Sequence, residues 1–108
     1  MKHGLEEEGF EVDVAEEGKN GLELALSGSF DLLLLDRMLP GMSGIVIFRT
    51  VRKSFPEVPI IFLTAKDTVD EIIFTPQTGA NDYIKKPFHF AELLERIRVQ
   101  LRELHKRK

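Results

Sequence analysis

Three residues with reactive side chains each stand at the end of a predicted strand in this sequence. Asp36 ends a run of leucines, Thr64 ends a second apolar run, and Lys86 follows a short strand at 81–85. Unbroken apolar runs are typical of strands buried on both faces, and parallel strands of one sheet end at a common edge. A carboxylate at such an edge can attack phosphorus, an ammonium group can pair with phosphoryl oxygens, and a hydroxyl can hydrogen-bond one of them. Together the three residues predict a phosphoryl-transfer site.

Each residue taken alone also has an ordinary structural interpretation. Asp36 can end a strand, Thr64 can cap the following helix, and Lys86 can be a surface lysine. Only their expected convergence favours a functional site. The histidines His3, His89 and His105 share no metal-ligand spacing and are assigned no role.

Length and composition indicate one small domain that contains no disulfides. The chain has 108 residues, no cysteine and a net charge of −3. Basic residues near the end of the chain are mixed with glutamates, which does not favour direct nucleic-acid binding. No apolar run approaches the length of about 20 residues that spans a bilayer. We therefore expect a cytoplasmic protein without a membrane segment.

The order of the predicted elements is that of an α/β doubly wound parallel sheet. Segment 10–14 alternates apolar and acidic residues, which predicts a strand near a sheet edge. Gly9 and Gly28 are expected to end the helices before them. The Lys86–Pro87 bond is a candidate cis peptide. The expected strands are 10–14, 30–35, 58–63 and 81–85, and the expected helices are 1–8, 19–27, 43–54, 67 to about 75, and 89–106.

Several motifs resemble the receiver domain of two-component response regulators, most closely the OmpR/PhoB-like type. They are Leu-Leu-Asp-Arg-Met-Leu-Pro-Gly-Met-Ser-Gly at 34–44, Leu-Thr-Ala at 63–65, Gly-Ala-Asn-Asp-Tyr at 79–83 and Lys-Pro-Phe at 86–88. The resemblance covers essentially residues 1–108, as a single receiver domain. It implies a flavodoxin-like, CheY-like fold and a signalling function rather than an enzymatic one.

The resemblance also implies roles for individual residues. Asp36 would accept a phosphoryl group from a sensor histidine kinase, and Lys86 would pair with that group. Thr64 would reorient toward it, and Tyr83 would be the aromatic side chain that swings inward on activation. The backbone carbonyl of Met38 would contribute, with Asp36, to the binding of Mg²⁺.

One departure from the family pattern concerns the metal. Receivers begin with a strand that ends in an acidic pair, whereas this sequence begins within what would be the following helix, so both carboxylates are absent. Glu6, Glu7 and Glu8 are expected on that helix, and the pair 16–17 is a remote substitute. Magnesium sites need one or two carboxylates in a near-octahedral oxygen shell. We therefore expect weak or absent magnesium binding and impaired phosphorylation of this shortened chain.

The absent strand would lie between segment 10–14 and the leucine strand. Either these two segments pair directly or another chain supplies the pairing, and uncovered apolar surface would favour a homodimer or an exchanged oligomer. Asp82, with Arg96 or Arg98, is expected to contribute to a dimer face. Two alternatives stay open: a receiver-like assembly module without phosphorylation, and, less favoured, a phosphatase that uses Asp36, for which the sequence offers neither a nearby general acid nor a cap insertion.

Overall fold

The structure is a computed structural model that describes residues 2–36, 44–64 and 82–106, without the side chains of Ile45, Thr64 and 103–106. Its elements, in chain order, are α1 (Lys2–Glu7), α2 (Gly18–Leu26), β1 (Leu33–Asp36), α3 (Gly44–Ser54), β2 (Ile60–Thr64), β3 (Asp82–Lys85) and α4 (Phe90–Lys106). The predicted loop after Asp36, which includes Met38, and the predicted helix 67–75 lie outside the described residues.

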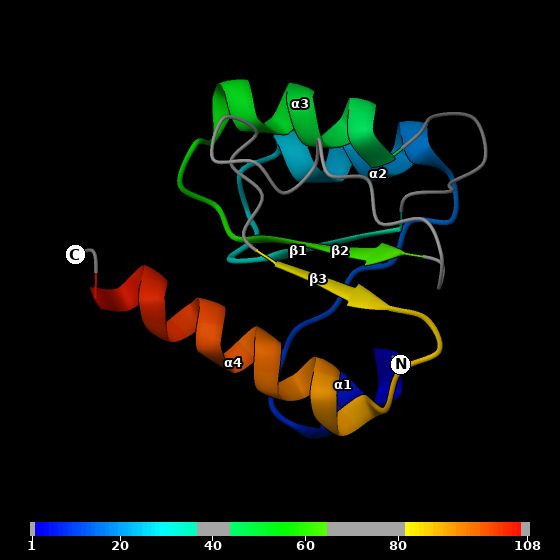
Figure 1. Cartoon of the computed structure of the whole chain (residues 1–108). Helices are drawn as coiled ribbons and strands as arrows, with labels where there is room; N and C mark the ends of the chain where they lie inside the picture. The colour runs from blue at the N-terminus through cyan, green and yellow to red at the C-terminus, as the bar shows by residue number, and fades with distance from the viewer. Residues whose placement is uncertain (1, 37–43, 65–81, 107–108) are drawn as a thin grey trace.

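Within the described residues the strands form a three-stranded parallel sheet in the order β1-β2-β3. Leu35 of β1 is in register with Phe62 of β2, which is in register with Tyr83 of β3. Helices α2 and α3 cover one face of the sheet, and α1 and α4 cover the other (Figure 1). This arrangement confirms the predicted doubly wound design.

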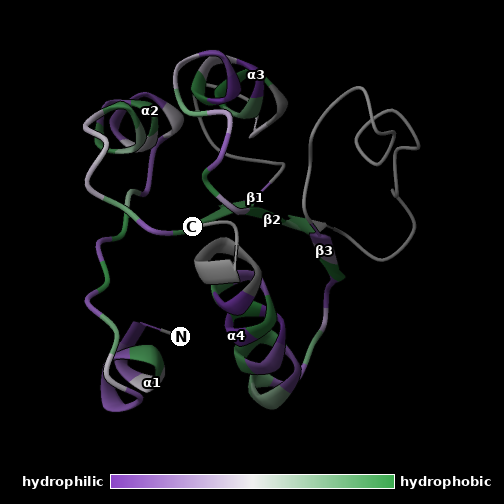
Figure 2. Ribbon diagram, turned by 90° about the vertical axis from the view of Figure 1, so that its left-hand side faces the viewer, coloured by the Kyte–Doolittle hydropathy of each residue, from purple (hydrophilic) through white to green (hydrophobic). Residues whose placement is uncertain are grey.

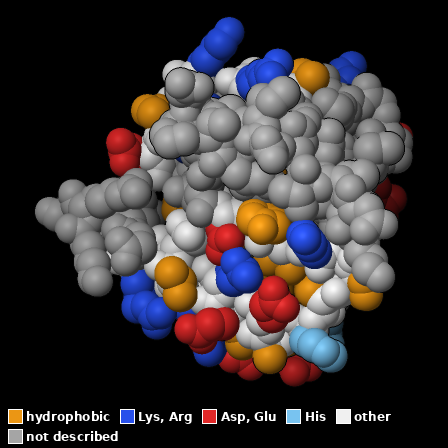
Figure 3. Space-filling view, viewed as in Figure 1, with side chains coloured by type: hydrophobic (Ala, Val, Ile, Leu, Met, Phe, Trp, Pro, Cys, Tyr) orange, Lys and Arg blue, Asp and Glu red, His pale blue; other side chains and the backbone are white. Residues whose placement is uncertain are grey.

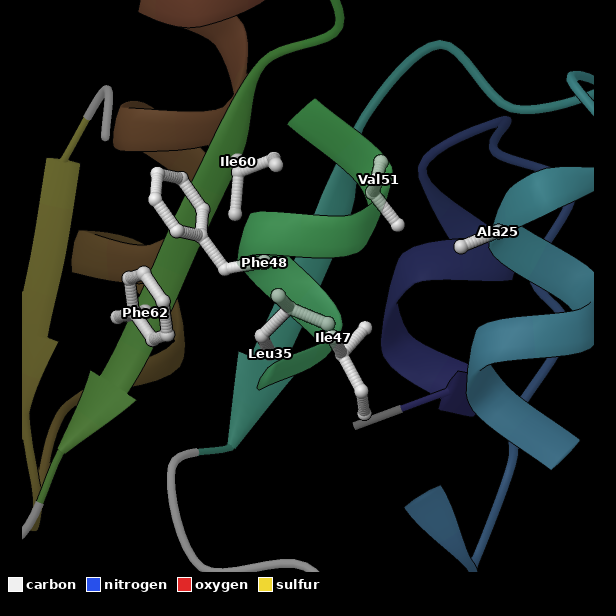
Figure 4. Close-up of a cluster of buried hydrophobic side chains, with 7 residues drawn as sticks. All are labelled: Ala25, Leu35, Ile47, Phe48, Val51, Ile60 and Phe62. Atoms are coloured by element: carbon white, nitrogen blue, oxygen red, sulfur yellow. The ribbon is translucent and has the colours of Figure 1, made fainter. Parts of the chain in front are cut away.

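Alternation along the strands divides the core into two clusters, one under each helical layer. In β2, Ile60 and Phe62 face α2 and α3, whereas Ile61 and Leu63 face α1 and α4. The first four residues of β2, 60–63, are therefore all apolar because both faces of the strand are buried. Figure 4 shows the first cluster, in which side chains of α3 converge on β1 and β2. Within it the rings of Phe48 and Phe62 lie 5.3 Å apart in a tilted arrangement.

Glycines end the first two helices where the sequence places them. Gly9 has a φ of 95° and Gly28 a φ of 76°, in the left-handed region that side chains disfavour. Gly28 also lies against Phe55, whose ring atoms would be 3.2 Å from an added Cβ. The predicted positions of α2, α3, β1, β2, β3 and α4 agree with the structure within a few residues, and the Lys86–Pro87 bond is cis.

Arg52 connects the end of α3 to the start of β2. Its Nη1 donates hydrogen bonds to the carbonyls of Phe55 (3.2 Å), Pro56 (3.0 Å) and Val58 (2.7 Å). Its guanidinium carbon also lies 5.5 Å from the centre of the Phe48 ring. One side chain thus hydrogen-bonds three carbonyls of the turn between α3 and β2 and connects the two elements.

The prediction of a strand at 10–14 is wrong. This segment forms no strand, and it joins α1 in one layer to α2 in the other, past the edge of the sheet (Figure 2). A strand exists only where a neighbour accepts its backbone hydrogen bonds, and the structure does not pair 10–14 with β1. Of the two alternatives for the gap, direct pairing of the two segments is therefore not found, and β1 is an edge strand among the strands that the structure describes.

A large groove lies between segment 10–14 and β1. It has a volume of about 1130 Å³ and is bordered by residues of both helical layers as well as by the edge of the sheet. Leu24 and Ala25 of α2 line one side, and Leu5, Ile97 and Leu101 of α1 and α4 line the other. The gap anticipated from the sequence is therefore present as an open, largely apolar groove.

Candidate functional site

Asp36 is the last residue of β1, at the carboxyl end of the sheet. The preceding residue, Leu35, is buried in the first core cluster, which fixes the direction of the strand up to that point. The Asp36 side chain is 32% exposed. A rigid strand thus delivers a carboxylate to the surface, where it is accessible to a second molecule.

Lys86 follows β3 and forms an ion pair with Asp36, its Nζ donating to Asp36 Oδ2. The two residues extend strands that are not neighbours, because β2 lies between β1 and β3. Since adjacent strands are about 4.8 Å apart, the two side chains together bridge roughly two strand spacings across the end of β2. The predicted convergence of this carboxylate and this ammonium group is present in the structure.

Thr64 ends the strand between them. It is the last residue of β2, in register with Lys85, so its backbone lies at the same sheet edge as Asp36 and Lys86. Its side chain lies outside the described part of the structure. The position of the strand end agrees with the expectation, and the role of the hydroxyl stays a prediction.

Tyr83 lies in β3 on the face covered by α2 and α3. It is half buried and packs against the first core cluster, in register with Phe62. Its backbone N–H donates to Asp82 Oδ1 at 2.8 Å. The residue is therefore anchored to the sheet by its backbone, while its ring lies at the border of the core.

Asp82 and Arg96 pair within the chain at 2.7 Å, and Glu92 lies 3.4 Å from the same guanidinium. The hydrogen bond that Arg96 Nη1 donates to Asp82 Oδ1 is the main cause that raises the pKa of Arg96, and burial acts in the opposite direction. Arg98 pairs with Glu8 at 2.8 Å and links α4 to the end of α1. Arg96 and Arg98, the two alternatives predicted for a dimer face, thus both have partners inside the chain.

The described residues do not make a complete magnesium site. Asp36 contributes one carboxylate, one of whose oxygens already accepts from Lys86. Across residues 2–36, 44–64 and 82–106, no three Asp, Glu or His side chains come together. Met38, whose carbonyl was expected to bind the ion, lies outside these ranges. These donors therefore do not fit a dedicated Mg²⁺ site.

The surface does not present a large patch of one sign of charge on the face seen in Figure 3. Acidic and basic side chains alternate across the described part of this face, over α4 and α1. This pattern matches the mixed charges of the sequence. Among the described helices, none is both long and apolar enough to cross a bilayer.

Comparison with known proteins assigns the family. The model of the response regulator receiver domain matches residues 1–98. The chain therefore belongs to the response regulator receiver domain family of two-component signalling, and the resemblance noted in the sequence is confirmed.

Curated relatives are transcriptional regulators from bacteria. The chain is 48% identical over 105 residues to the transcriptional regulatory protein HprR of Escherichia coli K12, covering 97% of the chain and 47% of HprR. It is 48% identical over 102 residues to CusR of the same strain, covering 94% of the chain and 45% of CusR. The chain thus spans about half the length of these relatives.

Solved structures share the fold. A CheY-like receiver domain protein from Methanospirillum hungatei JF-1 has a TM-score of 0.90 and 34% identity, covering 99% of the chain and 86% of that protein. The BeF3-activated N-terminal receiver domain of Klebsiella pneumoniae RstA has a TM-score of 0.81 and 36% identity, covering 94% of the chain and 86% of that domain. The CheY-like fold predicted from the sequence is confirmed.

Proposed function

We propose that residues 1–108 form a single receiver module in which Asp36 is the phosphoacceptor for a sensor histidine kinase. The observation that carries the proposal is the ion pair between Asp36 and Lys86 at the carboxyl end of the sheet. It joins a nucleophilic carboxylate to a cation that can pair with a transferred phosphoryl group. Membership of the receiver family supports the same assignment.

The proposed reaction needs only a phosphoryl donor. A carboxylate oxygen of Asp36 forms a bond to phosphorus while the bond from phosphorus to the donor's leaving group breaks, and that group departs with the bonding electrons. For a phosphohistidine donor the leaving group is an imidazole nitrogen, which takes a proton from water. Lys86 would then pair with a phosphoryl oxygen, Thr64 would hydrogen-bond another, and Tyr83 would move in response.

We also propose that the reaction is impaired in this chain. Across the described residues, Asp36 is not part of any group of three or more Asp, Glu or His side chains, and its Oδ2 already accepts from Lys86. Receivers bind Mg²⁺, and a single carboxylate is a weak ligand set for this ion. With little metal to neutralise charge, transfer to Asp36 should be slow.

Acetyl phosphate, which needs no protein partner, provides the test. The purified chain is incubated with acetyl phosphate and Mg²⁺, and the mass adduct is located by peptide mapping. The proposal expects slow labelling at Asp36, none in Asp36→Asn, and unchanged labelling in Asp31→Asn, whose parent carboxylate is exposed in the turn before β1. Labelling that survives in Asp36→Asn, or no labelling after long incubation, would contradict it.

A second candidate is an assembly module that is not phosphorylated. The observation that favours it is the groove beside β1, which leaves apolar side chains uncovered. On this account copies associate as a homodimer or an exchanged oligomer. Sedimentation velocity over a range of concentrations tests it, because a monomer that persists at high concentration would exclude self-association.

A further inference from the structure

The short loop from Lys86 to His89 carries the candidate cation of the site and joins β3 to α4 (Figure 1). Its two ends are fixed by the fold. Ile84 of β3 and Leu93 of α4 are buried in the second core cluster, which lies between the sheet, α1 and α4. The carbonyl of His89 accepts from the N–H of Leu93 at 3.3 Å, whereas positions 86–88 make no backbone–backbone hydrogen bond with any other described residue. Within this part of the structure, the middle of the loop is therefore held by side chains.

Phe88 anchors this loop to the core. Its half-buried side chain packs against the second core cluster, whereas Pro87 before it and His89 after it are exposed. Aromatic rings are large anchors, because each can bury about 150–250 Å². Within the Lys-Pro-Phe motif, the proposed reaction uses Lys86 and makes no use of the Phe88 ring. Among residues 87–89, Phe88 is therefore the one whose side chain fixes the path of the loop.

Lys86 needs a defined backbone position to reach Asp36. The two side chains together bridge roughly two strand spacings of about 4.8 Å, because β2 lies between their strands. The Lys86 side chain is 41% exposed, and its four-carbon stem is flexible. A misplacement of about 1 Å at a reacting site can reduce a rate about a hundredfold. A shift of the loop backbone at Lys86 would therefore be enough to take the ammonium group out of the site.

We propose that Phe88 is a positioning residue for Lys86: its ring, packed against the core, holds the loop so that Lys86 Nζ lies at the Asp36 carboxylate. This role rests on the proposed function, in which Lys86 pairs with the phosphoryl group on Asp36. Phe88 touches neither the donor nor the phosphoryl group and acts through Lys86. Fixing the base of a flexible cation before the reaction lowers the cost of ordering it during transfer.

Phe90 provides a matched control for Phe88. It is the same type of residue, two positions later at the start of α4, and it is 37% exposed. Two of its ring atoms lie 3.1 Å from the position of a Cβ added at Gly4 of α1. Among the described side chains, those that pack against the second core cluster include Phe88 and not Phe90. Phe90→Ala therefore removes an aromatic ring close to the loop and leaves the anchor of the loop in place.

The first measurement follows Lys86 itself and needs no phosphoryl donor. The purified chain is treated with limiting acetic anhydride, and tandem mass spectrometry gives the acetylation rate of Lys86 relative to Lys85, which is exposed in β3. Lys86 Nζ must leave Asp36 before it can react, so Asp36→Asn gives the rate of the released side chain. Phe88→Ala should raise the Lys86 rate about two- to fivefold toward that limit, and Phe90→Ala less than about 1.5-fold.

The second measurement is a double-mutant cycle on the labelling of Asp36 by acetyl phosphate, at fixed concentrations of donor and Mg²⁺. Phe88→Ala should lower this rate about fivefold, and Phe88→Leu, which keeps a large apolar side chain at the core, should restore most of it. In the Lys86→Gln chain the same Phe88→Ala change should cost less than about twofold, because no ammonium group is left to position. A loss caused by general loosening of the fold would be equal in both chains.

Circular dichroism establishes that each variant is folded, and Phe88→Val, a smaller loss of volume, replaces Phe88→Ala if the alanine variant is not. Three results would overturn the inference: unchanged acetylation of Lys86 in the Phe88 variant, an equal rise in Phe90→Ala, and equal losses of labelling in both arms of the cycle. An absence of Asp36 labelling in the unmodified chain would instead contradict the proposed function. The acetylation rates would then still decide whether Phe88 holds Lys86 in place.

Discussion

Lys86 donates a hydrogen bond to the carboxylate of Asp36, although 50 positions separate the two residues in the sequence. The ion pair crosses the end of β2, so it depends on the order of all three strands. A partly exposed pair of this kind contributes little to folding, about 0–1 kcal/mol. Its position at the sheet edge is the one that the proposed phosphoacceptor role of Asp36 requires of a cation.

Substitution of Lys86 distinguishes a role in phosphoryl transfer to Asp36 from a role in the stability of the fold. Lys86→Gln should lower the rate of Asp36 labelling by acetyl phosphate about tenfold or more, because the phosphoryl oxygens lose their cation. Its free energy of unfolding in urea should change by less than about 1 kcal/mol. The adjacent Lys85→Gln is the control, since Lys85 is exposed in β3, and it should change neither quantity. Equal labelling of the Lys86 variant and the unmodified chain would remove Lys86 from the site.

Leu93 provides a test of the second core cluster. Its side chain is fully buried between α4 and the sheet, with 0% exposure. Leu93→Ala should lower the free energy of unfolding by about 2–5 kcal/mol, through lost burial and the cavity left behind. Val99→Ala, at a 36% exposed position of the same helix, should cost much less. Urea denaturation followed by circular dichroism compares the two, and similar losses would show that α4 does not pack as described.

Replacing Gly28 and Gly21 with alanine should change the stability of the fold in opposite directions. Gly28→Ala places a Cβ at a φ of 76° and 3.2 Å from the Phe55 ring, so it should destabilise the chain by about 1–2 kcal/mol. Gly21 lies inside α2, where an added Cβ meets only Ala15 at 3.5 Å. Gly21→Ala should stabilise by up to about 1 kcal/mol through helix propensity. Thermal denaturation gives the sign of each change, and a stable Gly28→Ala would argue against the left-handed turn.

Arg52 should be more important for stability than its neighbour Arg49. Arg52→Met leaves the carbonyls of Phe55, Pro56 and Val58 without this donor and should cost about 1–3 kcal/mol. Arg49 is exposed on α3, and Arg49→Met should stay within about 0.5 kcal/mol of the unmodified chain. Equal effects in urea denaturation would show that the Arg52 hydrogen bonds do not support the connection to β2.

The sequence allowed most of the fold and the central pair of the site to be predicted. The strands that end at Asp36 and Thr64 are apolar on both faces, so their sequence pattern is unambiguous. Lys86 could be placed at the same edge of the sheet because the strands run parallel. Segment 10–14 was predicted wrongly because alternation indicates an extended chain but not a partner for its backbone. The groove lining also escaped prediction, since it joins residues of both helical layers that no local pattern relates.

The magnesium dependence of Asp36 labelling by acetyl phosphate tests the central claim most directly. The account predicts an adduct that is absent in Asp36→Asn. It also predicts that the rate of labelling still rises at magnesium concentrations far above the physiological range, because a single carboxylate holds the ion weakly. Labelling of Asp36→Asn at the same rate would contradict the assignment of the phosphoacceptor. Rapid labelling that saturates at physiological magnesium would contradict the proposed impairment.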